Sequence, residues 1–386
     1  MGFPFLHKYI FSDDVFFQAS AANIYRFKEI VHVKSVYFDC TGLIYRLSYS
    51  LPIESINPII LLDKLKKNVF YYLNIIRMFP EINTQPINLH LVFDGKPPKE
   101  KRIIQNTREE KNIAYVNKCL SRGKPLMGLS SICRSKRSDI ISKVSCDVFN
   151  YFVNHDEENI DNIDSINISE TFKGCGQVFV STSSEEGEAD IKIVKSILGG
   201  NKNENEYVII VTCDTDIFIS LESLRSQNVL VILSLPFSGQ YCLLSKPLNV
   251  WLQSNSIPYK NLLAYMMFFC GSDYETPLIS GTKNQITTIF NFAKENNFIV
   301  SINNFIRCWS ILNIKRSNEI QITNLNIETL KRIVFLKLRS TYENILYYSY
   351  GNNPSGACLV TNTKWSLLIK HILPSQIKSI IKNLDI

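Results

Sequence analysis

The sequence Ser183-Ser184-Glu185-Glu186-Gly187-Glu188-Ala189-Asp190 places four carboxylates within six residues. It lies between an apolar segment typical of a β-strand, residues 178–180, and a segment with helical apolar periodicity, residues 191–198. Like charges this close raise one another's pKa unless a cation neutralises them. One interpretation is an acidic first helical turn capped by Ser183 or Ser184, because a helix amino terminus favours negative charge. The other interpretation is a cation site.

Aspartates follow three further segments whose apolar patterns predict β-strands. The segments are residues 31–38, 87–93 and 207–211, and the acids that follow them are Asp39, Asp94, Asp214 and Asp216. Strands that alternate with helices imply a mostly parallel sheet, in which ligands bind beyond the carboxyl ends of the strands. One aspartate at a strand end is usually a turn residue or a helix cap. Three such ends, with the glutamate cluster and Asp273, favour a shared site.

The candidate site is built from carboxylates, without His or Cys. Such a set suits hard cations that prefer oxygen ligands, so we expect Mg²⁺ or Mn²⁺. Two such ions about 3.5–4 Å apart can hold the attacking water and the leaving oxygen of a phosphodiester in line. The sequence offers no Ser/His or Cys/His arrangement for acyl transfer, and it lacks the glycine fingerprints of phosphate and dinucleotide loops. The pattern therefore indicates phosphodiester hydrolysis with two ions.

Composition restricts the class of protein. Of the 386 residues, 45% are hydrophobic and 20% are charged, as in ordinary soluble globular proteins. There is no uncharged apolar run of about 18 residues and no signal-peptide pattern, so we expect an intracellular protein without a membrane span. The ten cysteines form no C-x-x-C pair, which favours reduced thiols over disulfides or zinc. A net charge of +7 admits a polyanionic partner without proving one.

A polar, basic segment spans residues 99–143. Its cations include Lys101, Arg102, Arg108, Lys111, Arg134, Lys136 and Arg137. If Lys101 and Arg108 share one helix, their spacing of about two turns places both on the same side. The alternative for this pair is a solvated basic helix face. Residues 154–170 are acidic and rich in Asn, and this composition predicts a loop.

Several motifs occur in an order that is informative as a set. They are Gly2, Phe38-Asp39-x5-Tyr45, Val92-Phe93-Asp94-Gly95-Lys96-Pro97-Pro98, Glu186-x-Glu188-Ala189, Asp214-x-Asp216 and Gly271-Ser272-Asp273-Tyr274. Together they resemble the 5′-nuclease superfamily, which contains the flap endonuclease/XPG nucleases and the Xrn-type 5′–3′ exoribonucleases. The resemblance runs from residue 1 to about residue 290.

The resemblance implies a PIN/flap-endonuclease-like α/β fold, with a mostly parallel central sheet flanked by helices, a basic helical arch and a helical C-terminal part. We expect a catalytic domain over residues 1–300 and a helical extension over 301–386. Within the catalytic domain, the expected parts are an N-terminal part at 1–98, the arch at 99–150, the acidic loop at 154–170 and an internal nuclease part at 178–300.

The resemblance also assigns roles to individual residues. One metal ion would be held by Asp39, Asp94, Glu186 and Glu188, and the other by Asp214, Asp216 and Asp273. The catalytic cations would be Lys101 and Arg108. The nucleic-acid contacts would be Gly2, Tyr45, Gln105, Arg134, Lys136, Arg137, Gly281 and Lys283. A core tyrosine is an equally good interpretation of Tyr45. The family's Gly-x-Gly-Pro-Lys hairpin is reduced here to residues 279–283, Ile-Ser-Gly-Thr-Lys.

The motifs contain features of both branches. The start of the chain and the string Glu-Gly-Glu-Ala-Asp-Ile-Lys-Ile favour the Xrn type, whereas Phe-Asp-Gly-Lys-Pro-Pro, Gly-Ser-Asp-Tyr and Tyr45 favour the flap nucleases. Only 57 positions separate Asp216 from Asp273, too few for the longer Xrn insertion. We therefore predict a structure-specific 5′ nuclease that acts on DNA in replication, repair or recombination. The alternatives are an Xrn-type exoribonuclease and an inactive nucleic-acid-binding scaffold.

Partners and location follow from the same resemblance. We expect DNA with a 5′ flap or a 5′ end in preference to RNA, and no membrane. The sequence contains no recognisable sliding-clamp motif, and we expect a monomer. The nucleus is favoured over the cytoplasm.

Overall fold

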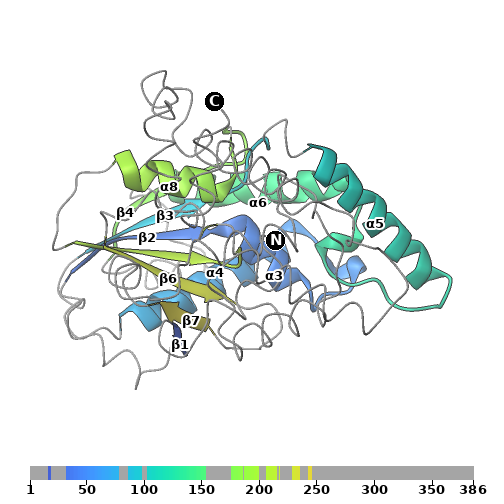
Figure 1. Ribbon diagram of the computed structural model, residues 1–386, viewed down its shortest axis with the longest axis horizontal. Helices are drawn as coiled ribbons and strands as arrows, with labels where there is room; N and C mark the ends of the chain where they lie inside the picture. Colours follow the sequence, from blue (N-terminus) through green and yellow to red (C-terminus); the bar gives the residue numbers. More distant parts are fainter. Residues whose placement is uncertain are drawn as a thin grey trace, which may run out of the picture. The chain divides into compact units, whose positions relative to one another are not determined.

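Seven strands form one sheet among the described residues of the computed structural model, in the order β1-β7-β6-β5-β2-β3-β4 (Figure 1). The strands are β1 (Phe16–Gln18), β2 (Val33–Asp39), β3 (Ile87–Val92), β4 (Cys175–Ser181), β5 (Tyr207–Thr212), β6 (Asn228–Ser234) and β7 (Cys242–Ser245). The five strands from β6 to β4 pair in parallel, whereas β7 pairs antiparallel with both β6 and β1. The predicted α/β class with a mostly parallel sheet is confirmed for this part of the chain.

The structure describes residues 16–18, 32–77, 86–97, 102–153, 175–185, 187–199, 206–214, 217, 228–234 and 242–245. For residues 16–18, 102–104, 152–153 and 242–245 it describes the backbone alone. All of these residues belong to one compact unit, Ser12–Trp251. The predicted acidic loop and the predicted C-terminal extension lie outside the described residues.

Five helices and two short 3₁₀ turns accompany the described strands. They are α3 (Cys40–Ser48), η1 (Ile53–Ser55), α4 (Pro58–Ile76), α5 (Arg102–Leu120), η4 (Leu129–Ser131), α6 (Arg134–Val153) and α8 (Ala189–Gly199). The start of α4 follows from its sequence, because Pro58 suits the first helical position and Asn57 caps the helix. The Asn57 side chain accepts a hydrogen bond from the amide of Ile60 at 3.0 Å. No helix in these segments is long and apolar enough to cross a membrane.

The two faces of the sheet are covered by different helices. Phe38, Leu91 and Ile232 belong to a buried cluster that also contains Leu65 of α4 and Val144 of α6. On the other face, the Tyr37 hydroxyl lies 3.1 Å from the Ser196 hydroxyl of α8. Figure 1 accordingly draws α8 and α4 on opposite sides of the strands. Burial of both faces explains why the strand sequences are almost continuously apolar.

The chain order reverses at β2. From β2 the chain adds β3 and then β4 on one side, and it then places β5 and β6 on the other side. In the register of the sheet, Asp39 pairs with Val92 of β3, and Phe38 pairs with Val211 of β5. The carboxyl ends of β2, β3 and β5 therefore lie side by side. Ligands of open parallel sheets bind at such a reversal point.

Candidate active site

Asp39 lies buried at the carboxyl end of β2, where it also caps α3. One carboxylate oxygen accepts a hydrogen bond from the Gly42 amide at 2.9 Å. The other oxygen accepts a hydrogen bond from the Thr212 hydroxyl at 2.9 Å, and the Thr212 hydroxyl oxygen accepts one from the Asp214 amide at 2.9 Å. A Cβ atom on Gly42 would lie 2.6 Å from the Asp39 carboxylate, so a side chain there would displace this carboxylate. Asp39 and Asp214 are thus joined through Thr212.

The electrostatic surroundings of Asp39 disfavour its charged form. Burial is the main cause that raises the pKa of Asp39, to about 6, and the negative charges of Asp214 and Asp190 raise it further. The hydrogen bonds from Gly42 and Thr212 act in the opposite direction. A bound cation would favour the charged form of all three carboxylates. The donor set, which consists of oxygen atoms alone, is of the type that Mg²⁺ and Mn²⁺ prefer.

Asp94 follows β3 and connects this strand end to α8. Its amide donates a hydrogen bond to the Thr41 hydroxyl at 2.8 Å. Its carboxylate accepts a hydrogen bond from the amide of Ala189, the first residue of α8, at 2.7 Å. Neither Ser183 nor Ser184 caps this helix, because the helix begins at Ala189. An acid from a neighbouring strand end satisfies the helix amide instead.

The turns that follow β3 and β4 are locked together by their main chains. The Gly95 amide donates to the Gly187 carbonyl at 2.8 Å, and the Gly187 amide donates to the Lys96 carbonyl at 3.3 Å. A Cβ atom on Gly95 would lie 1.6 Å from the Glu185 carbonyl oxygen, so no side chain fits there. Gly187 has a φ of +98°, which favours glycine. This contact holds the β4–α8 loop, of which residues 182–185, 187 and 188 are described, against the residues that follow Asp94.

Four of the seven predicted metal-binding acids are described, and all four follow the carboxyl ends of parallel strands or precede α8. They are Asp39, Asp94, Glu188 and Asp214. The other three, Glu186, Asp216 and Asp273, lie outside the described residues. Within the described segments, no group of three or more His, Cys, Asp or Glu side chains is close enough to hold a metal ion. The assignment of seven acids to two ions therefore stays a prediction.

The predicted nucleic-acid contacts on the basic segment lie on α5 and α6, and several of them join these two helices. Arg134 donates a hydrogen bond to the Gln105 side chain at 2.6 Å. Arg137 forms an ion pair with Glu109 at 2.7 Å and exposes only 11% of its side-chain surface. Arg108 is half-buried on α5, and Lys136 is exposed on α6. Lys101, Gly2, Gly281 and Lys283 lie outside the described residues.

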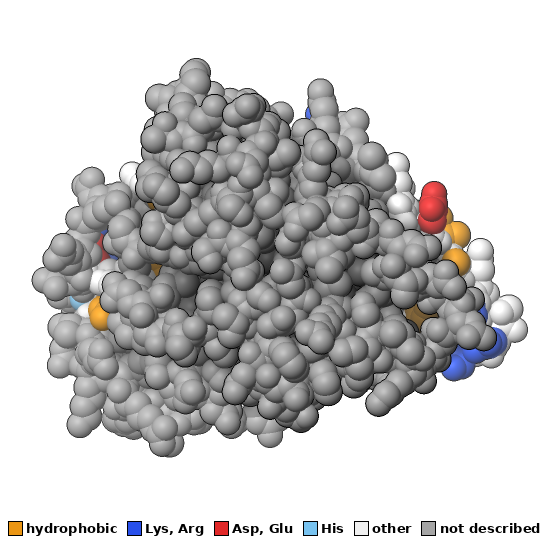
Figure 2. All heavy atoms as spheres, in the orientation of Figure 1, with side chains coloured by type: hydrophobic (Ala, Val, Ile, Leu, Met, Phe, Trp, Pro, Cys, Tyr) orange, Lys and Arg blue, Asp and Glu red, His pale blue; other side chains and the backbone are white. Residues whose placement is uncertain are grey.

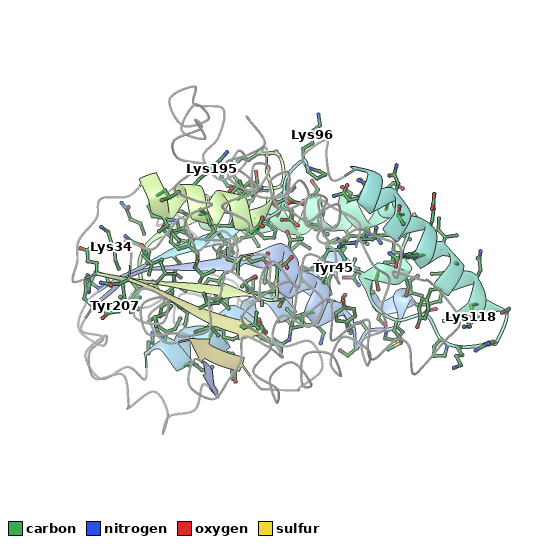
Figure 3. The ribbon with its side chains drawn as sticks, in the orientation of Figure 1. Lys34, Tyr45, Lys96, Lys118, Lys195 and Tyr207 are labelled. Atoms are coloured by element: carbon green, nitrogen blue, oxygen red, sulfur yellow. The ribbon has the colours of Figure 1, made fainter. Side chains whose placement is uncertain are left out.

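Tyr45 lies on α3 (Figure 3). It is close enough to interact electrostatically with Asp94, at the acidic edge of the sheet (Asp39, Asp94 and Asp214), and with Glu109 and Arg137, which join α5 to α6. Its half-buried side chain packs against the main hydrophobic cluster. Burial is the main cause that raises the pKa of Tyr45, to about 12, and the charges of Asp94 and Glu109 add to this effect while that of Arg137 opposes it. Tyr45 is therefore near both regions and is also part of the packing around the main hydrophobic cluster.

Sequence reasoning missed the residues that hold the acids in place. Thr41 and Thr212 each lie two positions from an acid of the set, Asp39 and Asp214, and this spacing was an available signal. Lys192 was also missed. Its ammonium group donates hydrogen bonds to the carbonyl oxygens of Phe93 and Thr182. These contacts link segments that are far apart in the sequence, so no local sequence pattern predicts them.

The described part of the chain is a mostly parallel α/β sheet with flanking helices. No family model matches the chain, and no curated protein matches it. Three similar solved structures are the catalytic core of Rad2 in complex with a DNA substrate, human GEN1 in complex with Holliday junction DNA, and flap endonuclease-1 from Methanococcus jannaschii. All three are structures of 5′ nucleases of the XPG/flap endonuclease family.

The similarity is extensive in length but weak in detail. The Rad2 core is 14% identical with a TM-score of 0.37, over 86% of this chain and 80% of that one. Human GEN1 is 12% identical with a TM-score of 0.38, over 97% of this chain and 67% of that one. The archaeal flap endonuclease is 14% identical with a TM-score of 0.30, and the match covers 87% of this chain and 95% of that one. Similarity at this level carries no argument about this chain, so both the fold and the function are argued from the chain's own residues.

Proposed function

We propose that the chain is a divalent-metal-dependent 5′ nuclease of the flap endonuclease/XPG type that hydrolyses phosphodiester bonds in DNA. The observation that carries the proposal is the juxtaposition of acids from separate elements at one edge of the sheet. Asp39 ends β2, Asp214 follows β5 and Asp190 is in the first turn of α8. The negative charges of Asp214 and Asp190 raise the pKa of Asp39. Such an arrangement costs stability in the absence of a cation. A metal-binding role accounts for that cost.

The chain's own residues would prepare this site in advance. The Gly42 amide and the Thr212 hydroxyl fix both oxygens of Asp39, and the Ala189 amide fixes one oxygen of Asp94. Orientation of this kind limits the reorganisation needed when substrate binds. When bound at these acids, divalent ions would supply activation of the attacking water and stabilisation of the leaving oxygen.

The other predicted ligands and the two catalytic cations complete the proposal. Glu186, Glu188, Asp214, Asp216 and Asp273 would complete the ligand set. Lys101 and Arg108 would stabilise negative charge that develops on the phosphate in the transition state.

An exposed face of α5 is suited to a single strand of nucleic acid. Lys111, Tyr115 and Lys118 follow one another at spacings of four and three residues, which places them on one side of the helix. All three are exposed, Tyr115 at 61%. Exposed cations attract the backbone, while an aromatic ring offers a surface on which a base can stack. In the region where Figure 1 draws α5, Figure 2 shows Lys or Arg atoms together with hydrophobic atoms.

This face refines the prediction for the basic segment. Because Arg134 and Arg137 are engaged in contacts between α5 and α6, we assign diffuse attraction chiefly to Lys111, Lys118 and Lys136. The alternative is a solvated helix face with no ligand. Substitutions on this face distinguish the two, as described in the Discussion.

A cleavage assay on two substrates tests the proposed function. With Mg²⁺ or Mn²⁺, the protein should cut a labelled 5′-flap DNA near its junction and leave a 5′-phosphate, and EDTA should abolish cutting. Single-stranded RNA with a 5′-monophosphate should be degraded far more slowly. Processive digestion of the RNA without flap cleavage would instead identify the Xrn type. Absence of cleavage, together with no Mn²⁺ binding by calorimetry, would identify an inactive scaffold. The associated proposals of a monomer, a nuclear location and a role in replication, repair or recombination rest on the motif resemblance alone.

A further inference from the structure

Lys192 lies near the start of α8 and is almost completely enclosed. It exposes 10% of its side-chain surface. Its ammonium group donates hydrogen bonds to the Phe93 carbonyl at 2.9 Å and to the Thr182 carbonyl at 2.8 Å. The Glu185 carboxylate lies 3.9 Å from the same nitrogen. One cation therefore contacts the residue before Asp94, the first residue after β4, and an acid of the loop between β4 and α8.

Hydrogen bonds and nearby negative charges offset the cost of enclosing the Lys192 ammonium group. Burial lowers the pKa of Lys192, and the negative charges of Glu185 and Asp94 oppose that shift. An enclosed ammonium group is costly unless its N–H groups are hydrogen-bonded. Here two of them reach carbonyl oxygens at the ends of β3 and β4. The favourable interaction thus depends on these strand ends and α8 being held together.

Lys192 and Asp94 attach α8 to β3 at two neighbouring points. The Asp94 carboxylate accepts from the first amide of α8, while Lys192 of α8 donates to the carbonyl of residue 93. The reciprocal contact between Gly95 and Gly187 adds a third connection, from the loop to the turn after β3. Glu188 lies between these attachment points in the sequence.

We propose that Lys192 is a positioning residue of the acidic site, which fixes residues 182–188 against the end of β3 so that Glu188 and Asp94 serve the same cation. The inference rests on the proposed function for the identity of that cation, but the attachment itself is a property of the fold. Because its ammonium group is directed to main-chain carbonyls, Lys192 acts through other residues and does not contact the reacting phosphate.

The test compares three variants of the full chain. Lys192→Met removes the charge and the donors while it keeps the length of the side chain, and Lys192→Arg restores a cation. Lys195→Met is the matched control, because Lys195 lies on the same helix with an exposed side chain (Figure 3). Val69→Ala in α4 serves as a second control. It removes buried volume on the opposite face of the sheet and leaves the β4–α8 loop unchanged.

Two measurements are made on each variant. The first is Mn²⁺ affinity by calorimetry, for which we expect Lys192→Met to raise the Kd about 10-fold or more, as is usual when a residue that orients metal ligands is lost. The second is hydrogen–deuterium exchange of peptides that cover residues 93–97 and 182–190, which should become faster in Lys192→Met. Lys192→Arg should recover part of both effects. Lys195→Met should change neither, and Val69→Ala should lower the melting temperature without raising the Kd.

The outcomes separate the inference from the proposed function. Unchanged exchange in Lys192→Met would overturn the positioning role, whatever the metal result. Faster exchange in a protein whose unmodified form binds no Mn²⁺ would support the attachment and refute the metal-dependent function. An equal rise in Kd for Lys192→Met and Val69→Ala would also overturn the inference, because general destabilisation would then explain the effect.

Discussion

The acidic edge of the sheet and the pair of helices α5 and α6 are held together in different ways. At the edge, the acids are fixed by main-chain amides, buried hydroxyls and a glycine contact that admits no side chain. Between α5 and α6, the described hydrogen bonds all use at least one side chain, as between Arg137 and Glu109 and between Arg134 and Gln105. The first region leaves little freedom for an individual carboxylate. The outer face of α5, in contrast, presents the long, exposed side chains of Lys111, Tyr115 and Lys118.

This difference matches the two tasks that the proposed nuclease site would have to perform. Catalysis through metal ions needs ligands whose positions vary little, whereas a flexible strand of varied sequence needs contacts that adapt. We therefore expect substitutions at the edge to act on the rate and on folding. Substitutions on the exposed face of α5 should act on affinity and its salt dependence.

The largest effect is expected from loss of an edge carboxylate. Asp214→Ala or Glu188→Ala should lower kcat by several orders of magnitude with little loss of substrate binding, because each disturbs the metal geometry. Single-turnover rates and DNA affinity, measured separately, check this. Asp63→Ala, in an exposed position on α4, is the matched control and should keep its rate. Near-normal activity of either edge variant would contradict the two-metal assignment.

A second effect concerns pH. Because the pKa of Asp39 is raised from 3.8 to about 6, the folded state binds this proton more tightly than the unfolded state does. Without metal, the contribution of Asp39 to the free energy of unfolding should therefore be largest below about pH 4. It should fall by about 3 kcal/mol as the pH rises through about 6. Urea unfolding in EDTA measures the fall. Saturating Mg²⁺ should reduce it, since a cation favours the charged carboxylate.

The control for this prediction is Asp39→Asn, which lacks the titrating group. The difference in unfolding free energy between the two proteins should change with pH, while other groups cancel. A difference that is flat from pH 4 to pH 6 would show that Asp39 titrates normally, and the electrostatic argument for a cation would lose its support.

A third comparison uses one glycine from each region. Gly95→Ala should cost about 3 kcal/mol, because a Cβ atom there meets a main-chain oxygen that cannot move alone. Gly123→Ala, in the turn after α5, should cost only about 1 kcal/mol, since φ is +62° but the surrounding space is open. Urea denaturation of both variants gives the two values. Equal losses would mean that the edge is no more constrained than the helical turn.

The smallest effect is expected on the exposed face of α5. Lys118→Gln should weaken DNA binding modestly and reduce the slope of log K against log salt by about 1, as for loss of one phosphate contact. Lys34→Gln is the control, because Lys34 pairs with Glu206 at the opposite end of β2 from the acids (Figure 3). Kd values at several salt concentrations decide the matter. An unchanged slope would leave this face as solvated surface.

Much of the fold could be predicted from local patterns. The apolar segments before Asp39, Asp94 and Asp214 are strands of the parallel sheet. Asn57 and Pro58 mark the start of α4 in the sequence itself. Strands that are buried on both faces can be recognised from their continuous apolar composition. A capped helix start can be recognised because the cap and the helix it caps are neighbours in the sequence. The short β1 and β7 were not predicted, because three or four residues carry too little periodicity.

The contacts that complete the candidate site could not be predicted in this way. The cap of α8 comes from Asp94, which lies 95 positions away, and the hydroxyl on Asp39 comes from Thr212, 173 positions away. Arg137 looked like a surface cation, yet its partner Glu109 lies on another helix. Partners of this kind are set by tertiary packing, which a pattern along the chain does not contain.

Asp39 illustrates how little separates an enzyme from an inactive copy on this fold. Asparagine is as good a helix cap as aspartate, and its amide could donate to Thr212, whose hydroxyl oxygen has room for a second donor. Codons for aspartate and asparagine differ by one nucleotide. A single transition could therefore remove a metal ligand while the cap of α3 and the packing at the reversal point survive. Selection on folding alone would not detect such a change, so only continued demand for catalysis would keep aspartate at this position.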